Sequence, residues 1–217
     1  STTFIFCRDC GYTLKCPRCE LPLTFHRGDD NLLCHTCGYT RKLPQSCPHC
    51  RSRRIRQFGT GTEKVADVLK EYFPQARVLR WDADTTRAKD AQDIILTQFR
   101  HHQADLLIGT QMLAKGLDLP LVTLVGVVLA DVGLNFPDYR SAERAFQLLT
   151  QVAGRAGRSQ LGGRVILQTF QPDHYAIRFA AKHDFAGFYQ QELTYRRQLN
   201  YPPILNMVRF EVRDSDN

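Results

Sequence analysis

Two arginines, Arg155 and Arg158, stand three residues apart in the stretch QVAGRAGR (151–158). Planar guanidinium groups neutralise the negative charge that spreads over a phosphoryl group while it is transferred. Gly154 and Gly157 would let the backbone turn so that both side chains face one way. The spacing of the two arginines therefore predicts a binding site for an anion. The alternative is that they only stabilise the C-terminal end of a helix, where cations are favoured.

The rest of a phosphate site is missing from the sequence. The segment GTGTEK (59–64) does not fit the pattern G-x-x-x-x-G-K-[ST], because Lys64 follows a glutamate. No acidic metal-binding box of the D-E-x-H kind is present. The chain therefore has no complete nucleotide site of its own. We interpret both ends of this chain, STTFIF and VRDSDN, as cuts through a longer protein.

Eight cysteines form four C-x-x-C pairs, all within the first 50 residues. The sequence shows no export signal, so metal binding is favoured over disulfides. A C-x-x-C turn directs two thiolates at one ion, and tetrahedral Zn²⁺ takes four such ligands. The sequence therefore predicts two zinc ions. The pairs are Cys7/Cys10, Cys16/Cys19, Cys34/Cys37 and Cys47/Cys50.

The way in which the pairs combine is indicated by spacing and by an internal repeat. CRDCGYTLKCPRC (7–19) recurs loosely as CHTCGYTRKLPQSCPHC (34–50). The two inner pairs give C-x₂-C-x₁₄-C-x₂-C, which is close to the zinc-ribbon spacing. A nested arrangement follows, although a sequential pairing and a crossed pairing of like with like stay open. The nested sites are Cys7, Cys10, Cys47 and Cys50 for one ion, and Cys16, Cys19, Cys34 and Cys37 for the other.

Four sulfurs fill a zinc site and leave no open position for water, which predicts structural rather than catalytic zinc. His26, His35 and His49 could also act as ligands, but we expect them to be surface or packing residues because the cysteines suffice. The region has few aliphatic residues, so metal binding should be what folds it.

Composition and charge set the class of protein. The 217 residues are 43% hydrophobic and 24% charged, which is enough for a globular core. No apolar run approaches the roughly 20 residues that a membrane helix needs. The formal charge of +7 is concentrated in residues 1–58, which hold ten of the 29 Lys and Arg but only four of the 22 Asp and Glu. Two zinc–thiolate centres would offset most of this excess, so charge alone gives nucleic-acid binding only weak support.

The elements that must position these residues alternate between strand and helix after residue 58, which predicts a parallel sheet covered on both faces. Helices are expected over 65–73, 88–102, 141–154, 173–183 and 185–199. Strands are expected over 76–82, 104–110, 122–131 and 163–170. A capping box, Thr60 to Glu63, is expected to start the first helix.

Two motifs in this part resemble those of a known enzyme class. GTQMLAKGLD (109–118) and QVAGRAGR look like motifs V and VI of superfamily-two helicases. With the cysteine array and SAERAFQLLTQVAGRAGR (141–158), the chain resembles the PriA family (primosomal protein N-prime) of replication-restart DNA helicases over nearly its whole length. The resemblance implies an α/β RecA-like second lobe with a zinc-ribbon-like domain. The implied divisions are a zinc region (1–57), the lobe (58–200) and the start of a further domain (201–217).

The resemblance also implies a nucleotide site shared between two lobes. The absent first lobe would hold ATP and Mg²⁺, while Arg155 and Arg158 would reach the γ-phosphate and Gln151 would lie beside it. Gly116 and Asp118 would contact the nucleotide, with Asp118 accepting from the ribose hydroxyls. The segment KGLDLP (115–120) departs from the KGHHFP common in the family, so the ribose role follows the wider superfamily.

DNA contacts are implied for Thr110 and Gln111 of motif V, which would bind a phosphate without recognising sequence. Thr60 and Thr62, at the N-terminus of the first helix, could bind another. Lys115 is a further candidate. Several residues of 130–146 could couple ATP closure to DNA movement or form a salt-bridged surface: Asp131, Asp138, Arg140, Glu143 and Arg144. Aromatic residues in or beside the zinc region could stack on unpaired bases or fill its small core: Tyr12, Phe25, Tyr39 and Phe58.

The implied function is a part of an ATP-dependent 3′→5′ DNA helicase that restarts stalled forks and loads the primosome. The chain by itself should not hydrolyse ATP. Expected partners are forked or single-stranded DNA, single-strand-binding protein and primosome proteins. No membrane is involved, and the expected location is the bacterial cytoplasm, associated with the nucleoid. The alternatives are a zinc-stabilised DNA- or partner-binding module without motor activity, and a lobe from a parent that has lost its ATPase.

Overall fold

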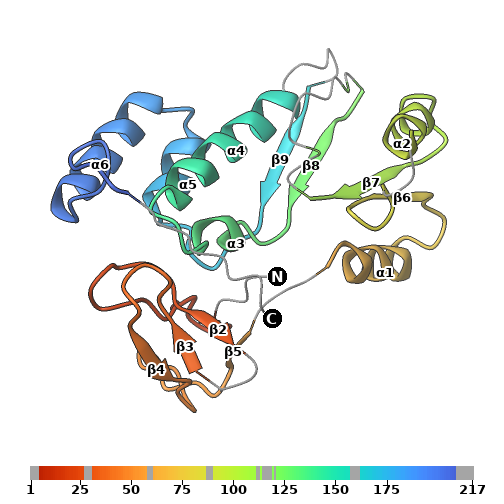
Figure 1. Cartoon of the computed structure of the whole chain (residues 1–217). Helices are drawn as coiled ribbons and strands as arrows, with labels where there is room; N and C mark the ends of the chain where they lie inside the picture. Colours follow the sequence, from red (N-terminus) through yellow and green to blue (C-terminus); the bar gives the residue numbers. More distant parts are fainter. Residues whose placement is uncertain are drawn as a thin grey trace, which may run out of the picture.

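A computed structural model describes residues 5–26, 31–57, 61–86, 90–110, 113, 119, 121–156 and 162–208. For residues 26, 56, 57, 155 and 156 the description covers the backbone but not the side chain. The chain forms a cysteine-rich region, residues 5–57, and an α/β lobe, residues 61–200 (Figure 1).

The cysteine-rich region consists of two small antiparallel sheets, one pairing β1 with β5 and the other in the order β2-β3-β4. Its strands are β1 (Ile5–Cys7), β2 (Thr24–His26), β3 (Asn31–Leu33), β4 (Thr40–Lys42) and β5 (Ile55–Gln57). Pairing of β1 with β5 sets Cys7 opposite Ile55, so the two ends of the region lie side by side. The core is small: a few aliphatic residues such as Leu23 and Leu32 are buried together with four of the cysteines.

The lobe alternates strands and helices, and its strands pair in parallel, β6 with β7 and β8 with β9. Its first elements are α1 (Thr62–Tyr72), β6 (Val78–Trp81), α2 (Ala91–Arg100), β7 (Leu106–Gly109) and β8 (Leu124–Val127). There follow α3 (Asp131–Leu134), α4 (Ser141–Ala156), β9 (Arg164–Leu167), α5 (Tyr175–Ala181) and α6 (Phe185–Gln198). The predicted class, α/β with parallel strands, is confirmed.

Helix α4 contacts β8 and β9, α5 packs on α4, and α6 packs on α5, while α1 and α2 contact β6 (Figure 1). Helix α4 buries Ala142, Ala145, Phe146 and Leu149, the spacing of one helical face. Phe146 stacks on Phe188 of α6, with ring centroids 4.0 Å apart. Among the described residues, none of the helices combines the length and apolar character needed to cross a membrane.

Two local predictions are wrong. Helix α1 starts at Thr62 with Gly61 as its N-cap and no side-chain capping bond, so the capping box from Thr60 is not formed. The Thr62 hydroxyl donates instead to Asp82, which follows β6. The strand expected over 122–131 is also too long. Leu129 takes a left-handed φ of 61°, which ends the extended run before Asp131 begins α3.

The cysteine-rich region packs against the lobe at two points. The rings of Phe6 in β1 and Phe170, which follows β9, meet edge to face with centroids 5.2 Å apart. The Tyr201 hydroxyl donates to the carbonyl oxygen of Cys19 over 2.8 Å. Tyr201 is buried and its ring stacks on Tyr139, just before α4. Through Tyr201 and Tyr139, the cysteine-rich region is therefore joined to the start of the helix that ends in the arginine motif.

Candidate functional site

Each C-x-x-C pair begins the same six-residue turn, which we call a knuckle. In every knuckle the N–H of the first cysteine donates to the carbonyl five residues later over 2.8 Å. The N–H of the fifth residue donates back to the carbonyl of the first cysteine over 2.9 Å. The fifth residue always has a left-handed φ, between 55° and 71°. These bonds fix both thiols of a pair on one side of the turn. The knuckles are 7–12, 16–21, 34–39 and 47–52.

The eight thiols come together in the nested grouping, one group from the outer knuckles and one from the inner knuckles. Within each group all sulfurs lie within 4.8 Å of one another. The shortest separations across knuckles are 3.5 to 3.7 Å. A tetrahedron with Zn–S bonds of about 2.3 Å has edges of about 3.8 Å, so the thiol groups fit two zinc ions. The groups are Cys7, Cys10, Cys47 and Cys50, and Cys16, Cys19, Cys34 and Cys37.

The thiols of one group differ in acidity. Burial acts to raise the pKa of Cys7, but the backbone N–H groups of Asp9 and Cys10 hold it at about 7. The N–H of Tyr39 lowers the pKa of Cys37 to about 7. Burial raises the pKa of Cys10 to about 12. A divalent cation bound among the four sulfurs of a group would supply the positive charge that favours their thiolate forms.

The arginine motif lies at the end of α4. Gln151 is exposed on this helix, and the backbone of Arg155 forms part of its last turn. Gly154 is helical, so the expectation that it turns the chain is wrong. The side chain of Arg155 and all of Arg158 and Gly157 lie outside the described residues.

Motif V begins where β7 ends. Thr110 directly follows this strand and is exposed. A side chain at Gly109 would collide with the carbonyl oxygen of Trp81, so the two strands are closely packed at that point. The other expected contacts of this motif and of the first helix lie outside the described residues: Gln111, Lys115, Gly116, Asp118 and Thr60. Thr62 is described, and its hydroxyl is occupied by Asp82.

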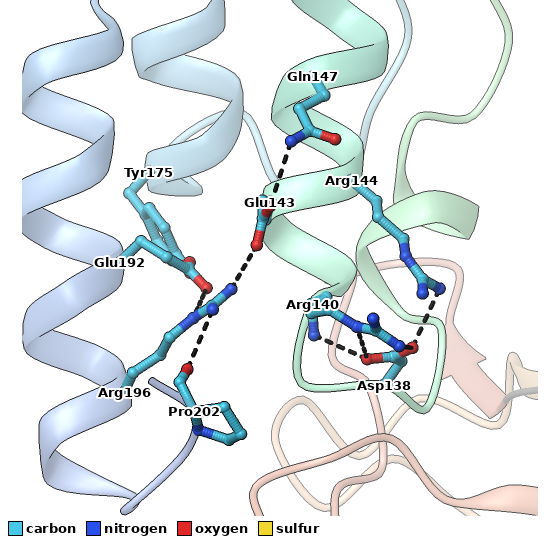
Figure 2. A network of polar contacts seen from close by, with 9 residues as sticks. All are labelled: Asp138, Arg140, Glu143, Arg144, Gln147, Tyr175, Glu192, Arg196 and Pro202. Carbon is cyan, nitrogen blue, oxygen red and sulfur yellow. Dashed lines mark hydrogen bonds and ion pairs between the residues drawn. The ribbon is translucent and has the colours of Figure 1, made fainter. Parts of the chain in front are cut away.

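Ion pairs surround the start of α4 (Figure 2). Asp138 pairs with Arg140 over 3.2 Å and with Arg144 over 3.0 Å. Glu143 accepts from Arg196 of α6 over 2.6 Å. The network has two groups of contacts, Asp138 with Arg140 and Arg144, and Glu143 with Arg196, so this part of the predicted coupling segment is salt-bridged (Figure 2).

The network continues into α6, where buried Glu192 accepts from Arg196 over 2.8 Å and from the Tyr175 hydroxyl over 2.6 Å. Arg196 also donates to the carbonyl oxygen of Pro202 (Figure 2). Asp131 is fully buried and accepts from the N–H of Phe170, so it holds the segment after β9. These contacts join α4, α5, α6 and the docking site of the cysteine-rich region.

Two family models match the chain. The "PriA DNA helicase Cys-rich region (CRR) domain" matches residues 16–42. The "Helicase conserved C-terminal domain" matches residues 42–160, which is more than half of the chain. The chain belongs to the PriA family of DNA helicases.

Similar PriA proteins come from distant bacteria, and each is named "Replication restart protein PriA". That of Bacillus subtilis is 52% identical over 93% of this chain and 25% of its own length. That of Synechocystis is 52% identical over 95% of this chain and 25% of its own length. That of Haemophilus influenzae is 38% identical over 98% of this chain and 29% of its own length. The chain thus spans about a quarter of the length of the PriA relatives it matches.

The PriA Cys-rich model covers the inner thiol group, whereas the outer group adds Cys7 and Cys10 from before it and Cys47 and Cys50 from after it. The outer group therefore joins the two ends of the cysteine-rich region, and the inner group joins segments that lie between those ends.

The aromatic residues that could stack on bases or fill the small core separate into two kinds. Phe25 is buried in the core, so it takes the packing role. Tyr39 packs against the same core, and Phe58 lies outside the described residues. Tyr12 is 37% exposed and stacks on His49, a pairing that the sequence analysis missed. The repeated CGYT gives Tyr12 and Tyr39 equivalent places in the first and third knuckles, but it does not place His49 beside Tyr12.

Proposed function

We propose that the chain supplies the second RecA-like lobe of an ATP-dependent 3′→5′ DNA helicase that restarts stalled replication forks and loads the primosome. The observation that carries this proposal is the stretch QVAGRAGR at the end of α4, in a parallel α/β lobe of the PriA family. Helix α4 is held to the lobe by its buried apolar face and by the ion pair of Glu143 with Arg196 of α6, so the helix that carries Arg155 is anchored in the lobe. Rigid positioning is what transition-state stabilisation requires.

In this proposal Arg155 and Arg158 neutralise the γ-phosphate of ATP, which the first lobe binds together with Mg²⁺. Gln151 is exposed on the same helix, one turn before Arg155, which suits a place beside the nucleotide. Gly116 and Asp118 contact the nucleotide, and Asp118 accepts from the ribose. Closure of the two lobes on ATP and their opening after hydrolysis would move the DNA.

DNA phosphates are the proposed ligands of Thr110, Gln111 and Thr60. The exposed position of Thr110 at the end of β7 supports its role. Thr62 could contribute its backbone N–H at the start of α1, because its hydroxyl already donates to Asp82. Such contacts hold a strand without recognising its sequence.

Two structural Zn²⁺ ions are proposed for the thiol groups. The zinc region would engage the DNA junction, single-strand-binding protein or other primosome proteins. The proposed place of action is the bacterial cytoplasm, at the nucleoid. A lobe without its ATP-binding partner should not hydrolyse ATP.

The decisive experiment is Arg158→Ala in a full-length helicase that contains this segment. ATP hydrolysis should fall by about 10³-fold or more, since an arginine finger contributes that much to the rate. Binding of single-stranded DNA should change less than twofold. Arg178→Ala, at an exposed position of α5, is the matched control and should leave hydrolysis unchanged. Unchanged turnover in Arg158→Ala with intact DNA binding would favour the module without motor activity.

A further inference from the structure

A groove of about 580 Å³ is lined by residues of all four knuckles and by Gln171 of the lobe. Residues 10–13 and Tyr39, which belong to the two CGYT repeats, contribute to its walls, and the lobe contributes Gln171. The groove therefore combines side chains from both halves of the internal repeat with one from the segment after β9. The lining residues with charged or aromatic side chains are Tyr12, Lys15, Glu20, Tyr39, Arg41 and His49, and Thr13 and Gln171 add uncharged polar groups.

Two flat rings lie at the groove. Tyr12 and His49 are stacked with their planes 6° from parallel and their centroids 5.8 Å apart. Both residues are exposed. An exposed, nearly parallel ring pair offers a flat surface of the kind on which a nucleobase stacks. A base within a duplex has both of its faces covered by its neighbours, so only an unpaired base can use this surface.

Positive charge lies at the same place. Lys15 and Arg41 line the groove, and within the described residues neither of them forms an ion pair with a carboxylate. Glu20 is the acidic residue of the lining. A phosphate between Lys15 and Arg41 would gain two cationic partners, as expected for a groove that follows a nucleic-acid backbone.

The groove is held in place from two sides. Cys10 and Cys16 line it and belong to different thiol groups, so the two proposed metal ions would fix this part of its wall. Gly11 packs directly on Phe170 of the lobe, where an added Cβ would lie 2.8 Å from the carbonyl oxygen. A preformed site loses little conformational entropy when it binds its ligand.

We propose that this groove binds one unpaired nucleotide of a DNA strand. The base stacks on the Tyr12–His49 pair, and the adjoining phosphate lies between Lys15 and Arg41. The proposal deepens the proposed function and rests on it for the identity of DNA as the ligand. It places a strand-holding site in the cysteine-rich region, separate from the motif V contacts.

The test uses this chain with both zinc ions bound and a fluorescent oligothymidylate of about ten nucleotides, within the usual range of single-strand sites. Tyr12→Ala should weaken binding about 5- to 20-fold, the lower part of the range for loss of one stacking partner. Tyr12→Phe keeps the ring and should bind within twofold of the unchanged chain. Tyr72→Ala removes an exposed aromatic residue of α1 outside the groove and should also bind within twofold.

Position is tested by photocrosslinking with 5-iododeoxyuridine in the same oligonucleotide. Crosslinks should map to Tyr12 or His49 by mass spectrometry. Zinc content, measured for every variant, shows that the fold is intact. Unchanged affinity of zinc-loaded Tyr12→Ala, or crosslinks elsewhere in the chain only, would overturn the proposal. Oligonucleotide binding by Tyr12→Ala and ATP hydrolysis by Arg158→Ala are measured separately. A result against the groove is therefore distinguished from a result against the ATP-dependent motor.

Discussion

At the scale of single residues, the four knuckles share one backbone turn but not one amino acid at its left-handed position. Gly11 and Gly38 occupy it in two knuckles, each with φ of 71°. Glu20 and Arg51 occupy it in the other two, with φ of 55° and 61°. A side chain in this region costs about 1–2 kcal/mol. Glu20 and Arg51 adopt this conformation despite its free-energy cost. The two backbone hydrogen bonds of each knuckle and its metal-ligating cysteines must therefore stabilise the turn.

The two glycines give a matched pair of variants. An alanine at Gly38 has no neighbour within 4 Å of its Cβ, so Gly38→Ala should cost only about 1–2 kcal/mol of unfolding free energy. An alanine at Gly11 would also meet the backbone of Phe170 at 2.8 Å, so Gly11→Ala should cost more and displace the lobe contact. Urea unfolding with zinc bound gives the energies. Amide exchange at Phe170 should accelerate only in Gly11→Ala, and equal energies with equal exchange rates would contradict the docking.

At the scale of elements, α5 begins with an unusual N-cap. The Nδ1 atom of His174 accepts from the N–H of Ala176 over 3.2 Å. Only a neutral imidazole can accept this bond. Burial, with a smaller contribution from the charge of Lys15, lowers the pKa of His174 to about 4. Since His174 caps α5 and Lys15 belongs to the cysteine-rich region, the pKa of this histidine reports both on the start of α5 and on the neighbouring region.

The lowered pKa predicts a pH dependence. An unfolded histidine has a pKa of about 6.5, so between about pH 6.5 and 4 the unfolded chain binds a proton that the folded chain does not. The contribution of His174 to stability is fully present above about pH 6.5 and is lost as the pH falls towards 4, by about 1–3 kcal/mol. His174→Asn keeps a capping side chain that does not titrate, so its urea midpoint should fall less over this range.

The control for His174 is His183→Asn, at an exposed position with φ of 53° that asparagine tolerates. Its pH profile should follow that of the unchanged chain. Parallel profiles for all three proteins would show that His174 titrates normally.

Sequence patterns predict the elements of the lobe well because each is defined by burial over many residues. The face of α4 is visible as a periodic apolar row, and β7 and β8 are visible as short apolar runs. The pattern fails where one local contact decides. Helix α1 begins at Thr62, whose hydroxyl donates to Asp82, twenty positions later in the chain. Such a contact depends on the completed fold, and neither propensity nor spacing contains it.

The candidate site also has one part that the sequence predicts and one part that it does not. The nested thiol groups follow from cysteine spacing, because each knuckle is a local turn whose ends can be counted along the chain. The groove at Tyr12 does not follow from spacing. Tyr12, His49 and Gln171 come from three separate segments, and only the folded chain brings them together.

At the scale of the whole molecule, nesting explains why a small region can act as a rigid body. The inner thiol group joins residues 16 and 37, and the outer group joins residues 7 and 50 around it. Strands β1 and β5 pair at the closure, and β1 carries Phe6 to the lobe. Loss of the outer metal should therefore release the lobe contact first, whereas loss of the inner metal should unfold the region from within.

Double substitutions discriminate nesting from every other pairing of the knuckles. Zinc per chain should be one in Cys7→Ser, in Cys47→Ser and in the double variant of both, because each change removes the same outer ion. The combination of Cys7→Ser with Cys16→Ser should hold none. Sequential pairing would give the opposite results for the two doubles, and a crossed pairing would leave both without zinc. Mass spectrometry under native conditions counts the ions, and since bound metal is folding free energy in such regions, each lost ion should also lower the unfolding midpoint of the region.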